Sequence, residues 1–307
     1  MKKILVIICI LLSTLIGCQS KEEISVIVPN GVPSIAQSYM EYNHDDHQFN
    51  IERVHGPQPL VAAFTSQSHD IIIAPVNLGA NLYQKDIPYQ LLGVLTWSNL
   101  QIISKTLIND IHDLSGKDII AFGEGAVPQM IIDYLFENIT LEKDANIQYT
   151  SSSAQESLMT FMQSDDSMAI VSEPVTSSAR NSIEDLYVLD LADVWKEYTD
   201  EDLFPQAGVF VHKDLPLTIV EDYLTQINLS SEFANQNPTQ VASYCESLNY
   251  PFEKSILEIS IPKSQIHFQS IDYSKDAIES FLEMIYQYKP ELIGNSMPDN
   301  DWYYPLS

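Results

Sequence analysis

Residues 119–128 read Ile-Ile-Ala-Phe-Gly-Glu-Gly-Ala-Val-Pro, an apolar run that ends in a glycine-rich turn and a proline. An unbroken apolar run suits a strand that is buried on both faces of a parallel sheet. Proline suits the first turn of a helix, where its missing N–H would have no partner anyway. The stretch therefore predicts a strand, a tight turn and a helix to about Asn138, with one apolar stripe at positions 127, 130, 131, 134 and 135.

The same order of elements occurs in both halves of the chain. In the second half, the helix is followed by a predicted strand, helix and strand before Pro174-Val175: 147–150, 154–163 and 168–171. In the first half, the predicted elements end before Pro75-Val76: strand 24–28, a turn at 29–33, a helix to about Tyr42, strand 49–54, a helix opening near 57–59 and strand 71–74. Strands that alternate with helices indicate βαβ units. Two such units in tandem predict an α/β protein of two similar, doubly wound lobes.

The links between the lobes are predicted from the segments that separate the repeats. Residues 97–105 form the first bridge, with Ile102-Ile103 as one crossing strand, and residues 209–211 are the candidate for the return. The rest is mostly helical and is expected to pack back on the first lobe. We therefore expect lobe I at 24–99 plus 206–307, which makes it discontinuous, and lobe II at 100–205.

The N-terminus has the form of a secretory signal. Lys2 and Lys3 precede a short apolar run that is well below the roughly 20 residues needed to cross a bilayer. Leu15-Ile16-Gly17-Cys18 resembles the bacterial lipobox, which implies a signal peptide at 1–17, acyl chains such as palmitate on Cys18 and a tether at 18–23. The alternative is an ordinary signal peptide with a chance cysteine. Lipidation would anchor the protein to the outer face of the bacterial cell membrane.

Charge and cysteine content narrow the possible partners. The net charge is −27, and loss of Lys2 and Lys3 with the signal brings it to −29. Such a body repels nucleic acid and anionic headgroups, so we expect no nucleic-acid partner and membrane contact through the lipid alone. Cys9 lies in the signal and Cys18 would carry lipid, which leaves Cys245 without a disulfide partner. We expect a monomer.

Four segments resemble ABC-importer substrate-binding proteins of the nitrate/sulfonate/taurine and thiamine-precursor group. They are His69–Ala80, Leu95–Leu100, the Asp113–Phe122 stretch with its Asp-Leu-Ser-Gly-Lys opening, and Val171–Val175. The resemblance implies a type II periplasmic-binding-protein fold, in which two crossing strands join the lobes and a small-molecule ligand lies between them. It also implies an importer permease and its ATPase as partners.

The glycine turns supply the first candidate ligand contacts. Helix N-termini have unpaired amides that can hold a carboxylate, sulfonate or carbonyl, and ligands of open α/β sheets lie beyond the carboxyl ends of the strands. The residues concerned are Asn30, Gly31 and Val32 in the first half and Gly125, Ala126 and Pro128 in the second. Alternatively, these are ordinary strand–helix turns.

Side chains supply the remaining candidates. Pro75, Asn77, Trp97 and Asn99 are expected in the first lobe, with Trp97 as a flat wall or, alternatively, as hinge packing. Ser152 could contact ligand or cap a helix. Glu173 could accept from a ligand N–H or pair across the lobes. The arginines, Arg53 and Arg180, both lie outside the expected turns, which disfavours a doubly charged oxyanion.

We expect binding without chemistry, with no cofactor, no metal and no catalytic residue. The run His44-Asp45-Asp46-His47 is too compact to wrap a tetrahedral ion easily. The expected ligand is a sulfonate-like anion or a vitamin-precursor heterocycle. Two alternatives stay open: an enzyme on the same fold, of a thiaminase-like, pyrimidine-forming or menaquinone-pathway kind, and a surface receptor that presents ligand to another protein.

Overall fold

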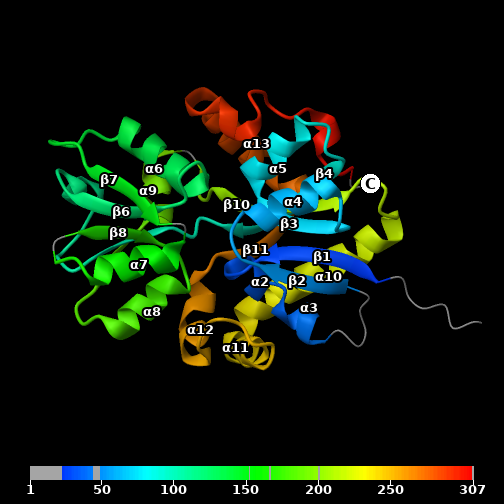
Figure 1. Cartoon of the computed structure of the whole chain (residues 1–307), viewed down its shortest axis with the longest axis horizontal. Coiled ribbons are helices and arrows are strands. Elements are labelled where there is room, and N and C mark those ends of the chain that lie inside the picture. Colours follow the sequence, from blue (N-terminus) through cyan, green and yellow to red (C-terminus); the bar gives the residue numbers. More distant parts are fainter. Residues whose placement is uncertain (1–22, 44–48, 152, 166, 200, 306–307) are drawn as a thin grey trace, which may run out of the picture.

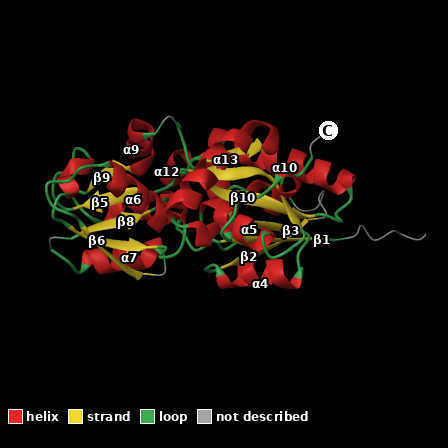
Figure 2. Ribbon diagram, turned by 90° about the horizontal axis from the view of Figure 1, so that it is seen from above, coloured by secondary structure: helices red, strands yellow, loops and turns green. Residues whose placement is uncertain are grey.

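The computed structural model describes residues 23–43, 49–151, 153–165, 167–199 and 201–305. Figure 1 shows two lobes that lie side by side, and the N-terminal strands share a lobe with the C-terminal helices. We call this lobe I, and the lobe made by the middle of the chain lobe II. The helices cover both faces of each sheet (Figure 2).

Lobe I is built on a sheet with the strand order β11-β4-β10-β3-β1-β2. Strands β1, β2 and β3 are parallel, whereas β10 runs antiparallel to both β3 and β4, and β11 antiparallel to β4. The strands are β1 (Ile24–Pro29), β2 (Phe49–Val54), β3 (Ile71–Pro75), β4 (Tyr89–Trp97), β10 (Pro205–His212) and β11 (Ile266–Ser270). The helices are α2 (Val32–Ile35), α3 (Ser38–Tyr42), α4 (Gln58–Ser66), α5 (Val76–Tyr83), α10 (Leu217–Gln236), α11 (Pro238–Ser247), α12 (Lys254–Ser260) and α13 (Ile271–Tyr288), with 3₁₀ turns η3 (Ile261–Lys263), η4 (Pro290–Ile293) and η5 (Asn300–Trp302).

Lobe II is built on a second sheet, in the order β7-β6-β8-β5-β9. Strands β6, β7 and β8 are parallel, and β5 runs antiparallel to its neighbours β8 and β9. The strands are β5 (Gln101–Ser104), β6 (Asp118–Phe122), β7 (Asn146–Ser151), β8 (Met168–Val171) and β9 (Tyr187–Asp190). The helices are α6 (Val127–Asn138), α7 (Ala154–Met162), α8 (Val175–Ser182) and α9 (Leu191–Tyr198), with the 3₁₀ turn η2 (Ile111–Leu114).

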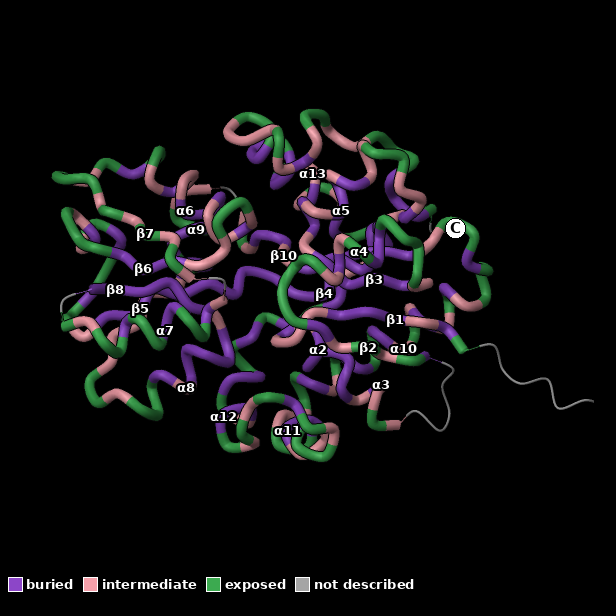
Figure 3. Tube along the Cα trace, in the orientation of Figure 1, coloured by how far each residue is buried: buried purple, intermediate pink, exposed green. Residues whose placement is uncertain are grey.

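The apolar runs of the sequence are the strands that both helix layers bury. In β3, Ile71 and Ile73 belong to the core on one face of the sheet, and Ile72 and Ala74 to the core on the other. Successive side chains of a strand point to opposite faces, so a strand covered on both sides must be apolar throughout. Figure 3 shows the central strands buried along their length, whereas the helices alternate between buried and exposed.

The repeat predicted from the sequence is present, with two local differences. The helix expected to reach Tyr42 is split into α2 and α3, because the Ser38 hydroxyl donates to the Ile35 carbonyl that a continuous helix would use. The helices that follow the Pro-Val steps, α5 and α8, were not predicted, and in α5 a glycine, Gly79, lies in the middle. A Cβ at Gly79 would stand 2.1 Å from the Phe210 ring, so glycine is what lets α5 lie on β10.

The predicted crossing strands are both sheet strands, which corrects the expected links. Ile102-Ile103 belongs to β5 of lobe II, and Val209-Phe210-Val211 belongs to β10 in lobe I. The chain crosses just outside them. Ser98 N donates to Phe204 O at 3.0 Å, and Phe204 N donates to Ser98 Oγ at 2.7 Å. The two crossing segments therefore lie side by side and brace each other.

The lobes also touch beside these crossings. Lys289, at the end of α13 in lobe I, forms an ion pair with Asp133 of α6 in lobe II. The rings of Tyr134 and Tyr288 meet edge to face with centroids 5.5 Å apart. Helix α12 of lobe I packs on α8 of lobe II. None of the described helices has the length and apolar character that a membrane span requires.

Candidate functional site

The carboxyl ends of the lobe I strands meet at one edge of the sheet. Strands β1 and β3 are parallel, and β4 runs in the same direction because both β3 and β4 are antiparallel to β10. The register pairs Pro75 with Ala207 and Trp97 with Pro205. The turns after β1 and β3 and the end of β4 therefore lie along one edge, which is where open α/β sheets bind their ligands.

The corresponding edge of lobe II faces this one. Gln101, the first residue of β5, pairs with Val171 at the end of β8 and with Asp190 at the end of β9. Only three residues separate Gln101 from Trp97, so the carboxyl ends of both sheets adjoin the crossing. We call the described turns at these ends the facing edges: residues 29–33, 75–77 and 97–99 in lobe I, and 122–128, 151, 153 and 171–175 in lobe II.

Asn77 is the predicted residue best placed to meet a ligand. It lies in the first turn of α5, and the residue is 5% exposed. Its Oδ1 is buried and has no hydrogen-bond partner among the described residues. A buried amide oxygen without a donor costs roughly 1–3 kcal/mol, which a bound donor would recover.

The first glycine turn has the expected backbone form. Asn30 follows β1 directly, and its N–H donates to Val54 O of the neighbouring β2 at 2.8 Å. Gly31 has a φ of 114°, and nothing lies within 4 Å of the position that a Cβ would take. Val32 is 4% exposed and belongs to the core, so only its backbone could face a ligand. The turn is open at its glycine. Helix α2, which follows, has only four residues and thus a weak dipole.

In the second glycine turn, some of the backbone N–H groups already have hydrogen-bond partners. Gly125 has a φ of 70°, and its N–H donates to Gln129 Oε1 at 2.8 Å. Ala126 precedes α6, and its N–H donates to Gly123 O at 3.0 Å. Pro128 packs on Gly123, where a Cβ would stand 2.7 Å from the proline ring. The N–H groups of Gly125 and Ala126, which we predicted as ligand contacts, are therefore occupied by bonds within the turn and to α6.

The structure brings Asn99 and Glu173 together, and the Asn99 side chain bonds to the Glu173 backbone rather than being left free for a ligand. Asn99 Oδ1 accepts from Glu173 N at 3.0 Å, and Asn99 Nδ2 donates to Glu173 O at 3.2 Å. The Glu173 carboxylate accepts from Ser177 N and from Ser177 Oγ, both at 3.0 Å. Burial raises the pKa of this carboxyl, whereas the bonds from Ser177 lower it. Both residues act first as braces of the hinge.

Trp97 packs in the hinge, as its alternative interpretation proposed. Its side chain is 3% exposed, and its indole N–H donates to His267 O at 2.8 Å. Pro75, at the end of β3, is partly exposed at the facing edge. Three sequence features lie outside the described residues: Ser152, Cys18 with the signal peptide and nearly all of the tether, and the His44–His47 run.

Two polar groups at the end of β7 were not predicted from the sequence. The hydroxyl oxygens of Tyr149 and Ser151 are buried and have no hydrogen-bond partner among the described residues. Burial raises the pKa of Tyr149, and the charges of Asp133 and Glu124 add to this. Both side chains lie on the same face of β7, since alternate residues of a strand share a face. Ser151 also pairs with Phe122, next to the second glycine turn.

Two surface hollows lie on lobe I, and His267, which lines the first, is the residue whose carbonyl accepts the Trp97 indole N–H. One, of about 650 Å³, is bounded by α10, β11 and the start of α13. The other, of about 520 Å³, lies where α5 ends and β4 begins. Neither is lined by a predicted site residue. No group of three or more His, Cys, Asp or Glu side chains in the described part of the chain is arranged to hold a metal ion.

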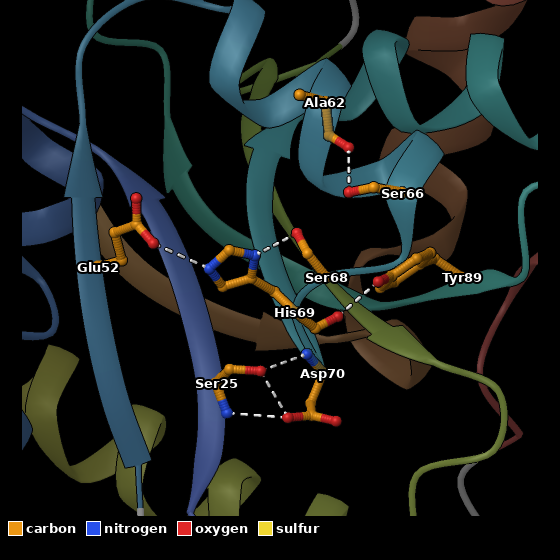
Figure 4. A network of polar contacts seen from close by, with 8 residues as sticks. All are labelled: Ser25, Glu52, Ala62, Ser66, Ser68, His69, Asp70 and Tyr89. Carbon is orange, nitrogen blue, oxygen red and sulfur yellow. Dashed lines mark hydrogen bonds and ion pairs between the residues drawn. The ribbon is translucent and has the colours of Figure 1, made fainter.

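A serine, a histidine and an acid stand in line at the other end of lobe I (Figure 4). Ser68 Oγ is 2.9 Å from His69 Nδ1, and His69 Nε2 is 3.1 Å from Glu52 Oε2. Beside them, Asp70 accepts from the N–H and hydroxyl of Ser25, at 2.8 and 2.6 Å. These contacts tie β1, β2 and β3 together. Ser68 is exposed, and neither of the two hollows adjoins it.

Comparison with known proteins places this geometry in a family. The chain is similar over 94% of its length to an ABC transporter protein from Parabacteroides distasonis, all of which is covered, with 24% identity and a TM-score of 0.82. It is similar to the periplasmic aliphatic sulphonate binding protein SsuA from Escherichia coli, with 12% identity, 94% of each chain covered and a TM-score of 0.70. The ligand-binding component of an ABC-type import system from Staphylococcus aureus has 12% identity and a TM-score of 0.68, with 92% of this chain and 96% of that one covered.

These likenesses establish the fold, which is the expected periplasmic-binding-protein fold of two α/β lobes. Among curated proteins, none is similar enough in sequence to match. A family model described as menaquinone biosynthesis matches residues 133–287, a little over half of the chain. The chain therefore belongs to the menaquinone-biosynthesis family and shares the fold of ABC-importer binding proteins.

Proposed function

We propose that this protein is an extracytoplasmic solute-binding protein that captures a small organic molecule between its lobes and delivers it to an ABC importer. The observation that carries the proposal is that both sets of strand ends meet across a three-residue crossing. At one of these ends lies Asn77 Oδ1, which has no hydrogen-bond partner among the described residues. The structural neighbours, which include importer components, support it.

Lobe closure is the proposed mechanism. Residues 24–99 with 206–307 would move as one body and residues 100–205 as the other, with bending at 98–100 and 203–206. A ligand that contacts both edges binds the closed form better than the open form, and so shifts the population toward closure. Docking on the importer permease would reopen the lobes, and the ATPase would drive that cycle.

Anchoring at Cys18 is part of the proposal. Acyl chains on this residue would hold a monomer at the outer face of the membrane, and the residues up to Glu23 would act as a tether. Cys18→Ser should move the protein from the membrane pellet to the soluble fraction. If that variant stays in the pellet, the lipid anchor is wrong.

A thermal-shift screen of small organic compounds on the mature lipoprotein in detergent tests the binding role. A ligand at about 100 times its dissociation constant adds about 2.7 kcal/mol to the stability of the folded state. At least one compound should raise the melting temperature and shrink the protein in small-angle scattering. A compound that binds without compaction would contradict lobe closure.

The family description favours an enzyme as the second candidate, because it names a biosynthetic pathway. The described cysteine argues against a thiol mechanism. Cys245 is fully buried in α11, and burial raises the pKa of its thiol to about 12. The nucleophile in such a mechanism is the thiolate, which this environment disfavours. If the protein turned over a bound compound and Cys245→Ser lost that activity, the enzyme hypothesis would be favoured. A receptor role would instead be favoured if no importer genes lie beside this one.

A further inference from the structure

The facing edges carry acids and no cation. In the described residues 29–33, 75–77, 97–99, 122–128, 151, 153 and 171–175 there is no Lys, Arg or His, whereas Glu124 and Glu173 are both present. A site without basic side chains can still hold an anion with the backbone N–H groups of a helix N-terminus. At α6, however, the Gly125 N–H already donates to the Gln129 side chain. An anion would thus meet few donors and two carboxyl groups.

Four basic residues around these edges act on nearby acids. Lys289 forms its ion pair with Asp133. Lys263, in η3 of lobe I, and Arg180, in α8 of lobe II, act on Glu173, where their charges favour the carboxylate that burial disfavours. Arg53 is engaged on the far side of β2, where it donates to Leu248 O at 2.7 Å and lies 3.4 Å from Glu41. Lys289 and Arg53 are thus engaged by acids, and the charges of Lys263 and Arg180 are offset in part by Glu173.

The unpartnered Asn77 oxygen points to the opposite kind of ligand. An amide oxygen can only accept a hydrogen bond, so its natural complement is an N–H or O–H group. The long-range field agrees, because a mature chain of net charge −29 repels anions and attracts cations during encounter.

We infer that the ligand of this site is a neutral or cationic nitrogen compound, such as an amide or an aminoheterocycle, that donates an N–H to Asn77 and carries no net negative charge. This separates the chain from its sulphonate-binding structural neighbour. The inference rests on the proposed function, since it concerns what the same site between the lobes would hold.

Matched pairs of probes test it. Benzenesulfonamide and benzenesulfonate have nearly the same shape, as do nicotinamide and nicotinate, but within each pair only the amide is neutral and has an N–H donor. Calorimetric titration of the mature lipoprotein in detergent should show the amide binding at least about tenfold more tightly than its anion, as one good hydrogen bond allows.

Variants of Asn77 make the test specific. Asn77→Leu keeps the size of the side chain and should remove that preference. Asn77→Asp keeps an acceptor and should preserve it, which guards against a variant that merely misfolds. Asn50→Leu is the control, because Asn50 is exposed in β2 at the opposite end of the sheet. It should bind both probes as the wild type does.

The outcomes separate the two claims. Tighter binding of the anions overturns the inference and leaves the proposed function in place, as does a preference that survives in Asn77→Leu. If no member of either pair binds, and the broader screen also finds no ligand, both the inference and the proposed function are contradicted. Binding of an anion in the broader screen alone overturns only the inference.

Discussion

The side-chain amide of Asn99 closes a two-way pair with the backbone of Glu173, accepting from its N–H at 3.0 Å and donating to its carbonyl at 3.2 Å. Asn99 lies in the segment that crosses between lobes, and Glu173 follows β8 in lobe II. The Asn99 backbone N–H also donates to the side-chain oxygen of Gln206, Oε1, at 3.1 Å. One residue thus ties both crossing segments to a strand end.

Asn99→Ala should destabilise the protein strongly. The change leaves the buried N–H and carbonyl of Glu173 without partners, and each such group costs about 1–3 kcal/mol. We expect a loss of about 3 kcal/mol in the free energy of unfolding, measured in urea. Asn109→Ala is the control, since Asn109 is exposed and bonds only to Asp113, and it should change stability by less than about 0.5 kcal/mol. Equal effects would show that the pair contributes nothing.

The two glycines of the second turn should respond differently to alanine. Both have a positive φ, so alanine is strained by about 1–3 kcal/mol at either position. At Gly125 nothing lies within 4 Å of the added Cβ, whereas at Gly123 it would stand 2.7 Å from the Pro128 ring. Gly123→Ala should therefore displace the start of α6 and weaken ligand binding beyond its effect on stability. Indistinguishable melting temperatures and affinities for the two variants would contradict this.

Trp97→Phe should affect folding rather than binding. Phenylalanine keeps most of the packing but loses the hydrogen bond to His267 O, which costs about 1–2 kcal/mol with the lost volume. Urea denaturation should show that loss, and titration should show an affinity close to that of the wild type. An affinity that falls tenfold at unchanged stability would restore Trp97 as a wall of the ligand site.

The repeat of strands and helices could be predicted because burial on both faces leaves a local mark in the sequence. Runs such as Ile71–Ala74 are apolar only because two helix layers cover them. The register of the sheets leaves no such mark. Residues 209–211 look like any apolar strand, and only their pairing shows that they lie between β3 and β4 in the sheet rather than in the crossing.

The candidate site was predicted by position more than by contact. Strand-end turns could be located from glycine and proline, so Gly31 and Asn77 were found at the facing edges. The partners of a polar side chain depend on distant residues, which is why the bonds of Asn99 to Glu173 and of Trp97 to His267 could not be foreseen. Tyr149 was missed because it sits in a strand of alternating exposure that gives no sign of an unpartnered hydroxyl.

Glu173 should give the protein a measurable pH dependence. Burial raises the pKa of its carboxyl above the ordinary 4.5, so the folded state holds the proton more tightly than the unfolded state. The resulting stabilisation is present below the unfolded pKa and is lost as the pH rises through the folded pKa. The stability of Glu173→Gln relative to wild type should therefore increase as the pH rises above the ordinary carboxyl pKa of 4.5 in urea titrations. A relative stability that falls over this range would mean that the bonds from Ser177 outweigh burial.

The ion pair between Lys289 and Asp133 should favour the arrangement in which the lobes touch. Both side chains are 27% exposed, so solvent screens the pair and about 0.5–1 kcal/mol is expected from it. Asp133→Asn should then enlarge the ligand-free protein in small-angle scattering and weaken ligand binding about two- to fivefold. Added salt should have the same effect on the wild type but little on the variant. Asp202→Asn is the matched control, because Asp202 pairs with Lys196 within lobe II, where the side chains are 79% and 66% exposed. If both variants change size and affinity equally, net charge rather than the contact between α6 and α13 sets the equilibrium between the lobes.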